Sequence, residues 1–168
     1  IARELIRQLE PFNTNITVVR RSAGQVPGAA STVTTDRLHK VLPGADVVVV
    51  AAALTGETTH LIGAKELALM KPTAVLVNIA RGPLVDPDAL VEALNAEKIY
   101  GAAMDVTQPE PLPDGHPLWT VKNVLITPHM ADTPDMTAPL LAERISRNVA
   151  AFIAGEQFTG VVDTEAGY

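Results

Sequence analysis

Val75-Leu-Val-Asn-Ile-Ala-Arg-Gly-Pro-Leu-Val-Asp86 joins an apolar run to a turn that contains glycine, proline and a single arginine. A near-continuous apolar run is typical of a strand that is buried on both faces of a parallel sheet. In open parallel sheets, ligands bind just beyond the carboxyl ends of the strands. The stretch therefore predicts a central strand with a functional turn at Arg81, although this turn alone also fits a solvated loop arginine.

Length and composition limit what the turn can do. The 168 residues suffice for one domain with a substantial core, and 47% hydrophobic against 19% charged residues excludes wholesale disorder. A net charge of -6 without a Lys/Arg run argues against nucleic acid as a partner. No cysteine is present and the four histidines are scattered, so we expect no metal site. No signal peptide or membrane-spanning run is visible, so we expect a cytoplasmic protein without a membrane partner.

Short apolar runs alternate with helical patterns, which predicts a parallel α/β sheet. Strands are expected at residues 16–19, 45–53, 75–77, 100–106 and 123–127. Helices are expected at residues 1–9, 35–41, 63–70, 86–96 and 133–154, with a loop between residues 22 and 31. In the last helix Thr133 is the expected N-cap, Gly155 the end, and Leu141, Ile145, Val149 and Ile153 form one apolar stripe.

Three chemically distinct side chains follow neighbouring strands. Arg81 follows the first of these strands, Glu110 the second and His129 the third. A guanidinium can bind a substrate carboxylate through two parallel hydrogen bonds, and an imidazole can exchange a proton while a carboxylate orients it and favours its charged form. The set suits reduction of a 2-keto acid by a nicotinamide cofactor. Spacing alone equally allows a hydrogen-bonded turn histidine and a solvated glutamate.

The motifs around these residues resemble those of the D-isomer-specific 2-hydroxyacid dehydrogenases. The resemblance covers nearly the whole chain and rests on residues 70–86, on Asp105-Val-Thr-Gln-Pro-Glu-Pro-Leu112 with Pro117-Leu-Trp119, and on Thr127-Pro-His129. Residues 51–61 are also similar, except that Ala53 stands where proline is usual. The resemblance implies a Rossmann-type doubly wound sheet and NAD(P)-dependent oxidation of D-2-hydroxy acids.

The resemblance also assigns residues. It implies that Arg81 binds the substrate carboxylate and that Glu110 is the partner of His129, the acid/base residue. It places Asp105 at the nicotinamide carboxamide, and it places four further residues beside positions that line the cofactor: Ile79, Ala80, Met130 and Ala131. Arg81 and His129 are expected to contact the cofactor as well as the substrate. His39, His60 and His116 are expected at the surface or in turns, and Trp119, Phe152 and Met70 in the packing.

In proteins of this family the dinucleotide-binding fold is inserted into a substrate domain. The resemblance therefore implies that this chain contains parts of both domains. Residues 1–132 are expected to form the dinucleotide-binding domain, and residues 133–168 a helix and tail that return to the substrate domain. Ile1-Ala2 is similar to the last residues of the family's glycine-rich turn, so the glycines and the first strand are expected to be missing. We therefore expect this chain alone to bind dinucleotides poorly, and the stripe of its last helix to be partly uncovered.

The end of the predicted strand at residues 16–19 bears on the cofactor. Dinucleotide folds that bind NAD have an acidic residue about 20 positions beyond the glycine turn, where an arginine accommodates the 2′-phosphate of NADP. Here the strand leads into Arg20, Arg21 and Ser22, which together can bind a phosphate. The sequence predicts NADP(H) as the preferred cofactor with NAD(H) possible, while solvated arginines that stack on adenine are the alternative.

Related functions stay open at this point. The same fold serves the C-terminal binding proteins, which sense dinucleotides and recruit protein partners, and sequence separates them weakly from the enzymes. Formate dehydrogenases of the superfamily pair the histidine with glutamine, so Glu110 argues against that branch. The expected partners are a small 2-keto or 2-hydroxy acid and a second copy in a homodimer; the identity of the acid stays open.

Overall fold

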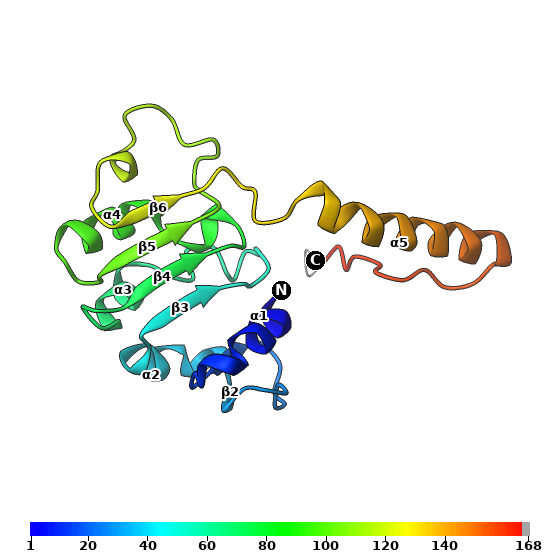
Figure 1. Ribbon diagram of the computed structural model, residues 1–168, viewed down its shortest axis with the longest axis horizontal. Helices are drawn as coiled ribbons and strands as arrows, with labels where there is room; N and C mark the ends of the chain where they lie inside the picture. The colour runs from blue at the N-terminus through cyan, green and yellow to red at the C-terminus, as the bar shows by residue number, and fades with distance from the viewer. Residues whose placement is uncertain (166–168) are drawn as a thin grey trace.

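The computed structural model describes residues 1–165, which form a parallel α/β sheet with a long helix at one side (Figure 1). The strands are β1 (Thr17–Arg20), β2 (Ser31–Thr34), β3 (Val47–Val50), β4 (Val75–Asn78), β5 (Gly101–Met104) and β6 (Val124–Ile126). The α-helices are α1 (Ala2–Leu9), α2 (Leu38–Val41), α3 (Ala64–Leu69), α4 (Pro87–Asn95) and α5 (Pro134–Ala154). The predicted α/β class and all five predicted strands are confirmed.

All strand pairs are parallel, and they fall into two groups. β1 pairs with β2, and the other strands follow in the order β3-β4-β5-β6. Within residues 1–165 no ladder joins β1 to β3. The doubly wound strand order has a further strand at this place. β2 was not predicted, because Ser31-Thr-Val-Thr34 has only one apolar side chain and follows a loop rich in glycine and proline.

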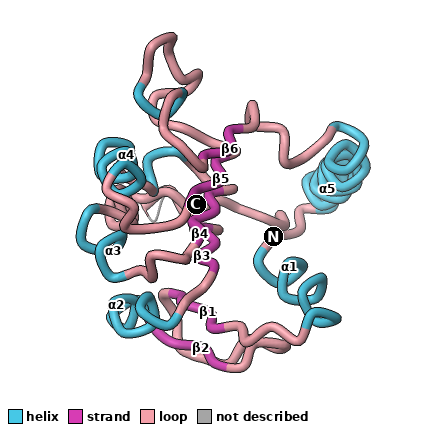
Figure 2. Tube along the Cα trace, turned by 60° about the vertical axis from the view of Figure 1, so that its left-hand side comes forward, coloured by secondary structure: helices cyan, strands magenta, loops and turns pink. Residues whose placement is uncertain are grey.

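The core lies between the four-stranded sheet and the helices on one of its faces. Figure 2 shows α2, α3 and α4 on one side of the sheet, with α1 and α5 on the other. Leu67 of α3, Leu76 of β4 and Leu90 of α4 are fully buried in this layer. Burial of each leucine contributes roughly 2 kcal/mol relative to exposure. This packing holds β4 rigidly, and with it the turn that follows.

The turn after β4 is closed by the start of α4. Asp86 caps this helix, since its Oδ1 accepts hydrogen bonds from the N–H groups of Asp88 and Ala89 at 3.1 Å each. Pro87 occupies the first helical position, where no hydrogen-bond donor is needed. The segment 79–85 is therefore held between a buried strand and a capped helix.

α5 projects away from the sheet (Figure 1). It begins after Thr133, whose side chain makes no capping hydrogen bond, continues through Pro139 and ends at Gly155 in a left-handed conformation. Its expected apolar stripe is exposed. No helix among the described residues is long and apolar enough to cross a membrane. The last three positions of the predicted segment 133–168 lie outside the described residues, and the predicted boundary after residue 132 stays a prediction.

Two expected packing residues are exposed instead. Trp119 is 52% and Phe152 73% exposed, whereas Met70 is buried as expected. Trp119 Nε1 donates to the carbonyl of Pro113, so the indole ring braces the loop after β5 rather than the core. Phe152 stacks on Phe158 of the tail with ring centroids 6.4 Å apart. Their aromatic character predicted burial, but both lie outside the layer between sheet and helices.

Candidate active site

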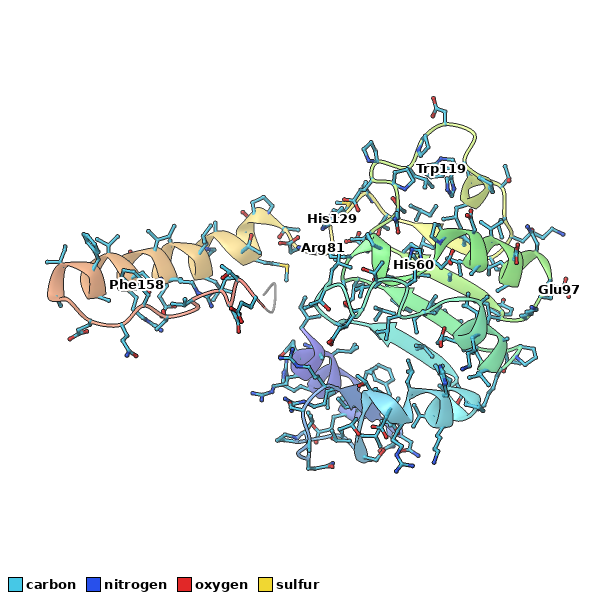
Figure 3. The ribbon with its side chains drawn as sticks, turned by 180° about the vertical axis from the view of Figure 1, so that it is seen from behind. His60, Arg81, Glu97, Trp119, His129 and Phe158 are labelled. Carbon is cyan, nitrogen blue, oxygen red and sulfur yellow. The ribbon has the colours of Figure 1, made fainter. Side chains whose placement is uncertain are left out.

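Three loops meet at the carboxyl ends of the central strands. Arg81 follows β4, Glu110 lies on the loop after β5, and His129 follows β6. The parallel register aligns Asn78 with Met104 and Met104 with Ile126, so these strands end at the same edge. Figure 3 shows Arg81 and His129 next to each other at this edge. The structure therefore brings the three predicted catalytic residues together.

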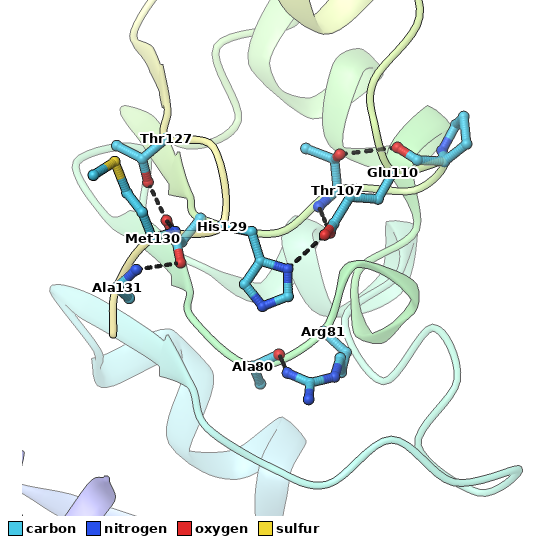
Figure 4. A network of polar contacts seen from close by, with 10 residues as sticks. Ala80, Arg81, Thr107, Glu110, Thr127, His129, Met130 and Ala131 are labelled. Carbon is cyan, nitrogen blue, oxygen red and sulfur yellow. Dashed lines mark hydrogen bonds and ion pairs between the residues drawn. The ribbon is translucent and has the colours of Figure 1, made fainter. Parts of the chain in front are cut away.

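His129 and Glu110 form a direct pair. The Nδ1 atom of His129 lies 2.5 Å from Oε1 of Glu110, and both side chains are about two-fifths exposed. Glu110 Oε2 accepts the N–H of Thr107 at 3.2 Å, and the Thr107 hydroxyl donates to the Pro109 carbonyl. Contact with Glu110 turns the other ring nitrogen of His129, Nε2, toward the side of Arg81 (Figure 4).

The charges at this site are complementary. The hydrogen bond from His129 lowers the pKa of Glu110, and this effect exceeds the opposing effect of desolvation. The N–H of Thr107 and the positive charges of His129 and Arg81 lower the same pKa further. Glu110 is therefore ionised at neutral pH and accepts the hydrogen bond from Nδ1 of His129.

Asp105 holds the loop that carries His129. Its Oδ1 accepts the Thr127 hydroxyl at 2.5 Å and the N–H of Met130 at 3.0 Å, while Oδ2 accepts the N–H of Ala131 at 2.9 Å. Desolvation raises the pKa of Asp105, but these three hydrogen bonds outweigh it and the net pKa is lowered. His129 has a left-handed backbone with φ of 53°, which is uncommon outside glycine. Asp105 therefore stabilises a turn that the sequence alone did not reveal.

A pocket of about 230 Å³ lies beside the loop of His129. It is lined by Val77, Ile79, Ala103, Met104, Asp105, Leu125, Thr127, Met130 and Ala131. Four of the residues predicted to line the cofactor are in this set: Ile79, Asp105, Met130 and Ala131. Three others, Ala80, Arg81 and His129, are not in the lining. Ala80 is buried in the turn before Arg81, where its N–H donates to the side-chain oxygen of Asn78. An apolar pocket with one carboxylate fits a flat nicotinamide ring that bears an amide.

The predicted phosphate-binding residues lie elsewhere. Arg20 ends β1 and its guanidinium donates to the hydroxyl of Ser22 at 2.7 Å, with Arg21 between them. All three are exposed and belong to the β1–β2 pair rather than to the four-stranded sheet. Such separation suits a long dinucleotide whose two ends bind at different strands. Across residues 1–165 no group of three acidic or histidine residues could hold a metal ion.

The family is settled by comparison with known proteins. The model for the NAD binding domain of the D-isomer specific 2-hydroxyacid dehydrogenases matches residues 1–131. The chain belongs to this family. Its Rossmann-like sheet and the loops at the strand ends therefore correspond to the NAD binding domain of this family.

Similar proteins include enzymes of this family with stated substrates. An uncharacterized protein from the proB 3′ region of Corynebacterium melassecola is 48% identical over the full 168 residues, which cover 55% of it. The glyoxylate reductase of Thermofilum pendens is 44% identical over 128 residues, which are 76% of this chain and 38% of the reductase. The chain thus spans about half or less of the length of these curated relatives.

A solved structure from the same family has a similar fold. The D-isomer specific 2-hydroxyacid dehydrogenase of Xanthobacter autotrophicus Py2, in complex with NADPH and MES, aligns with a TM-score of 0.87 and 37% identity. The alignment covers 97% of this chain and 66% of that one. Family membership and the Rossmann-type fold are confirmed; the roles of individual residues stay predictions.

Proposed function

We propose that the whole protein interconverts a 2-keto acid and a D-2-hydroxy acid, with glyoxylate among its substrates. The observation that carries the proposal is the His129–Glu110 pair beside Arg81, next to the apolar pocket. The similarity to a glyoxylate reductase supports a small keto acid as substrate. The predicted homodimer and cytoplasmic location stay predictions.

Each residue has a defined task in this proposal. The pocket of Ile79, Asp105 and Met130 would hold the nicotinamide ring, and the cofactor would supply the hydride. Arg81 binds the carboxylate of the keto acid through two parallel hydrogen bonds and so orients the carbonyl. His129 Nε2 gives a proton to the carbonyl oxygen as negative charge develops there, and it takes the proton back in the reverse reaction. Glu110 fixes the orientation of the ring through its contact with Nδ1, which leaves Nε2 for the substrate.

A panel of keto acids tests the function directly. The whole protein, given NADPH or NADH, should reduce glyoxylate, as followed by loss of absorbance of the reduced cofactor, and hydroxypyruvate, pyruvate and a branched keto acid are compared with it. Arg81→Ala should raise KM for the keto acid by about tenfold or more, because the carboxylate loses its charged partner. Absence of turnover with every acid and both cofactors would contradict the proposal.

The cofactor preference is a separate prediction. We infer that the whole protein prefers NADPH, because Arg20, Arg21 and Ser22 place two guanidiniums and a hydroxyl where an acid would select NADH. The structure of the Xanthobacter relative with NADPH supports this choice. A double variant, Arg20→Ala with Arg21→Ala, should lower kcat/KM for NADPH by about tenfold or more and leave NADH nearly unaffected.

The matched control for the cofactor test is Arg37→Ala, an exposed arginine that pairs with Asp36. This variant should keep the cofactor preference of the wild type. Equal efficiency with NADH and NADPH in the wild type, or a preference for NADPH that survives loss of both Arg20 and Arg21, would overturn the assignment.

A further inference from the structure

Asn78 is a polar residue in the most buried part of the sheet. It ends β4, pairs with Val50 on one side and Met104 on the other, and its exposed fraction is 0%. A buried amide is costly unless all its polar groups are hydrogen-bonded. The partners of Asn78 lie in the turn that carries Arg81, so its side chain serves that turn rather than the sheet.

The amide binds the turn at two points. Asn78 Oδ1 accepts the N–H of Ala80 at 3.1 Å, and Nδ2 donates to the carbonyl of Arg81 at 2.9 Å. This pair of bonds needs a donor and an acceptor on one short, planar side chain. Asparagine has both, whereas aspartate lacks the donor and leucine lacks both. The identity of this residue is therefore set by the backbone of the turn.

The turn is held from its other side as well. The Arg81 carbonyl also accepts the N–H of Leu84, and Gly82 packs directly against the carbonyl of Thr107. The main chain at Arg81 is thus clamped between the Asn78 amide and the loop that carries Glu110. Because the main chain at Arg81 is fixed, its side chain leaves the turn in a defined direction. Figure 4 shows the Arg81 side chain on the side of the turn that faces His129.

The main chain of Asn78 is also hydrogen-bonded to Asp105, which supports the loop of His129. Its main-chain carbonyl accepts the N–H of Asp105 at 3.0 Å, and Asp105 in turn holds the loop of His129. One buried residue thus links the strand end that bears Arg81 to the one that supports His129. The hydrogen bonds of its side chain, by contrast, go to the Arg81 turn.

We propose that Asn78 is a positioning residue that fixes Arg81 for binding of the substrate carboxylate. The inference rests on the proposed function for its kinetic consequence, but its structural part is independent of turnover. Loss of the side-chain amide alters carboxylate binding, while proton transfer by His129 is preserved because the main-chain bond to Asp105 remains.

The kinetic test uses Asn78→Ala in the whole protein. KM for the keto acid should rise about tenfold or more, while kcat falls by less than about threefold. The matched control is Asn123→Ala, because the Asn123 amide also donates to a backbone carbonyl of the sheet, that of Tyr100, at the amino ends of β5 and β6. Asn123→Ala should leave KM unchanged. An unchanged KM in Asn78→Ala, or equal losses in both variants, would overturn the proposal.

A second variant tests the donor by itself. Asn78→Asp keeps the shape of the side chain and the oxygen that accepts the N–H of Ala80. It replaces the NH₂ group that donates to the Arg81 carbonyl with a carboxylate oxygen. Burial raises the pKa of such a carboxyl, and its protonated form again has a donor. KM in Asn78→Asp relative to wild type should therefore fall as the pH is lowered. A ratio of KM values that does not change with pH would contradict the role of the donor.

Hydrogen exchange separates failure of this inference from failure of the proposed function. In Asn78→Ala, backbone amides of residues 79–84 should exchange faster than in wild type, whereas those of residues 101–104 should not change. Faster exchange in 79–84 supports the positioning role even if the wild type reduces no keto acid. Unchanged exchange there would overturn the positioning role even if the wild type is an active reductase.

Discussion

Gly82 occupies a place where no side chain fits. A Cβ at this position would lie 1.8 Å from the carbonyl oxygen of Thr107 and 2.2 Å from its carbonyl carbon. These are backbone atoms, so one of the two loops would have to move. The absence of a side chain at residue 82 therefore lets the Arg81 turn and the Glu110 loop lie side by side.

Substitution of this glycine tests the close approach of the loops. Gly82→Ala should lower the melting temperature and reduce kcat/KM for the keto acid by on the order of a hundredfold, because a displacement of about 1 Å can cost that much. Gly56→Ala is the control, since a Cβ there meets no atom within 4 Å. Full activity and normal stability of Gly82→Ala would contradict the packing described.

Sequence reasoning found the residues with distinctive chemistry and missed their supports. Arg81, Glu110 and His129 could be predicted because a guanidinium, a carboxylate and an imidazole follow successive strands. Asn78 and Thr107 could not, since the side chain of each is hydrogen-bonded to backbone groups of a turn. The sequence at the end of a strand does not show which backbone groups the side-chain amide of an asparagine there will bind.

At the scale of elements, one side chain joins two helices. Glu66 of α3 accepts the N–H of Gly63 through Oε2 at 3.0 Å, and its Oε1 lies 2.5 Å from Nε2 of His39 in α2. Desolvation raises the pKa of Glu66, but the hydrogen bonds from His39 and Gly63 outweigh it, so the net pKa lies below its usual value of 4.5. The ionised carboxylate therefore stabilises the contact between α2 and α3.

This contact makes stability depend on pH. The pKa of Glu66 is lower in the folded protein than in the unfolded chain. The stabilisation is therefore complete above the unfolded pKa of Glu66 and is lost as the pH falls through its folded pKa. Glu66→Gln should reduce the free energy of unfolding by roughly 1–2 kcal/mol at pH 7, and the difference from wild type should narrow as the pH falls below the ordinary pKa of 4.5. Melting temperatures across this range check it, with exposed Glu57→Gln as control. A constant difference between wild type and Glu66→Gln would refute the explanation.

Most elements could be predicted because their apolar patterns are strong. The runs around β3 and β4 and the pattern of α4 were assigned from sequence and are present. β2 was missed because its residues are small and polar, and its pairing with β1 decides its conformation. Trp119 and Phe152 were predicted to be buried because they are aromatic. Both are exposed, because the segments that carry them lie outside the core.

At the scale of the whole molecule, the parallel sheet is what assembles the site. Residues 81, 110 and 129 are far apart in sequence, and they meet because β4, β5 and β6 run in one direction and end at one edge. The pocket beside them is built from the same strand ends. We propose that at this edge His129 transfers a proton while Arg81 binds the substrate carboxylate.

The most direct measurement is kcat for glyoxylate reduction by the whole protein with His129→Ala. His60→Ala is a matched control, because His60 also has a left-handed backbone and lies 3.7 Å from a carboxylate, that of Asp86, but not in the site. We expect kcat to fall by about a hundredfold or more in His129→Ala, with cofactor binding preserved and His60→Ala near wild type. A rate for His129→Ala close to that of the wild type would contradict the proposal.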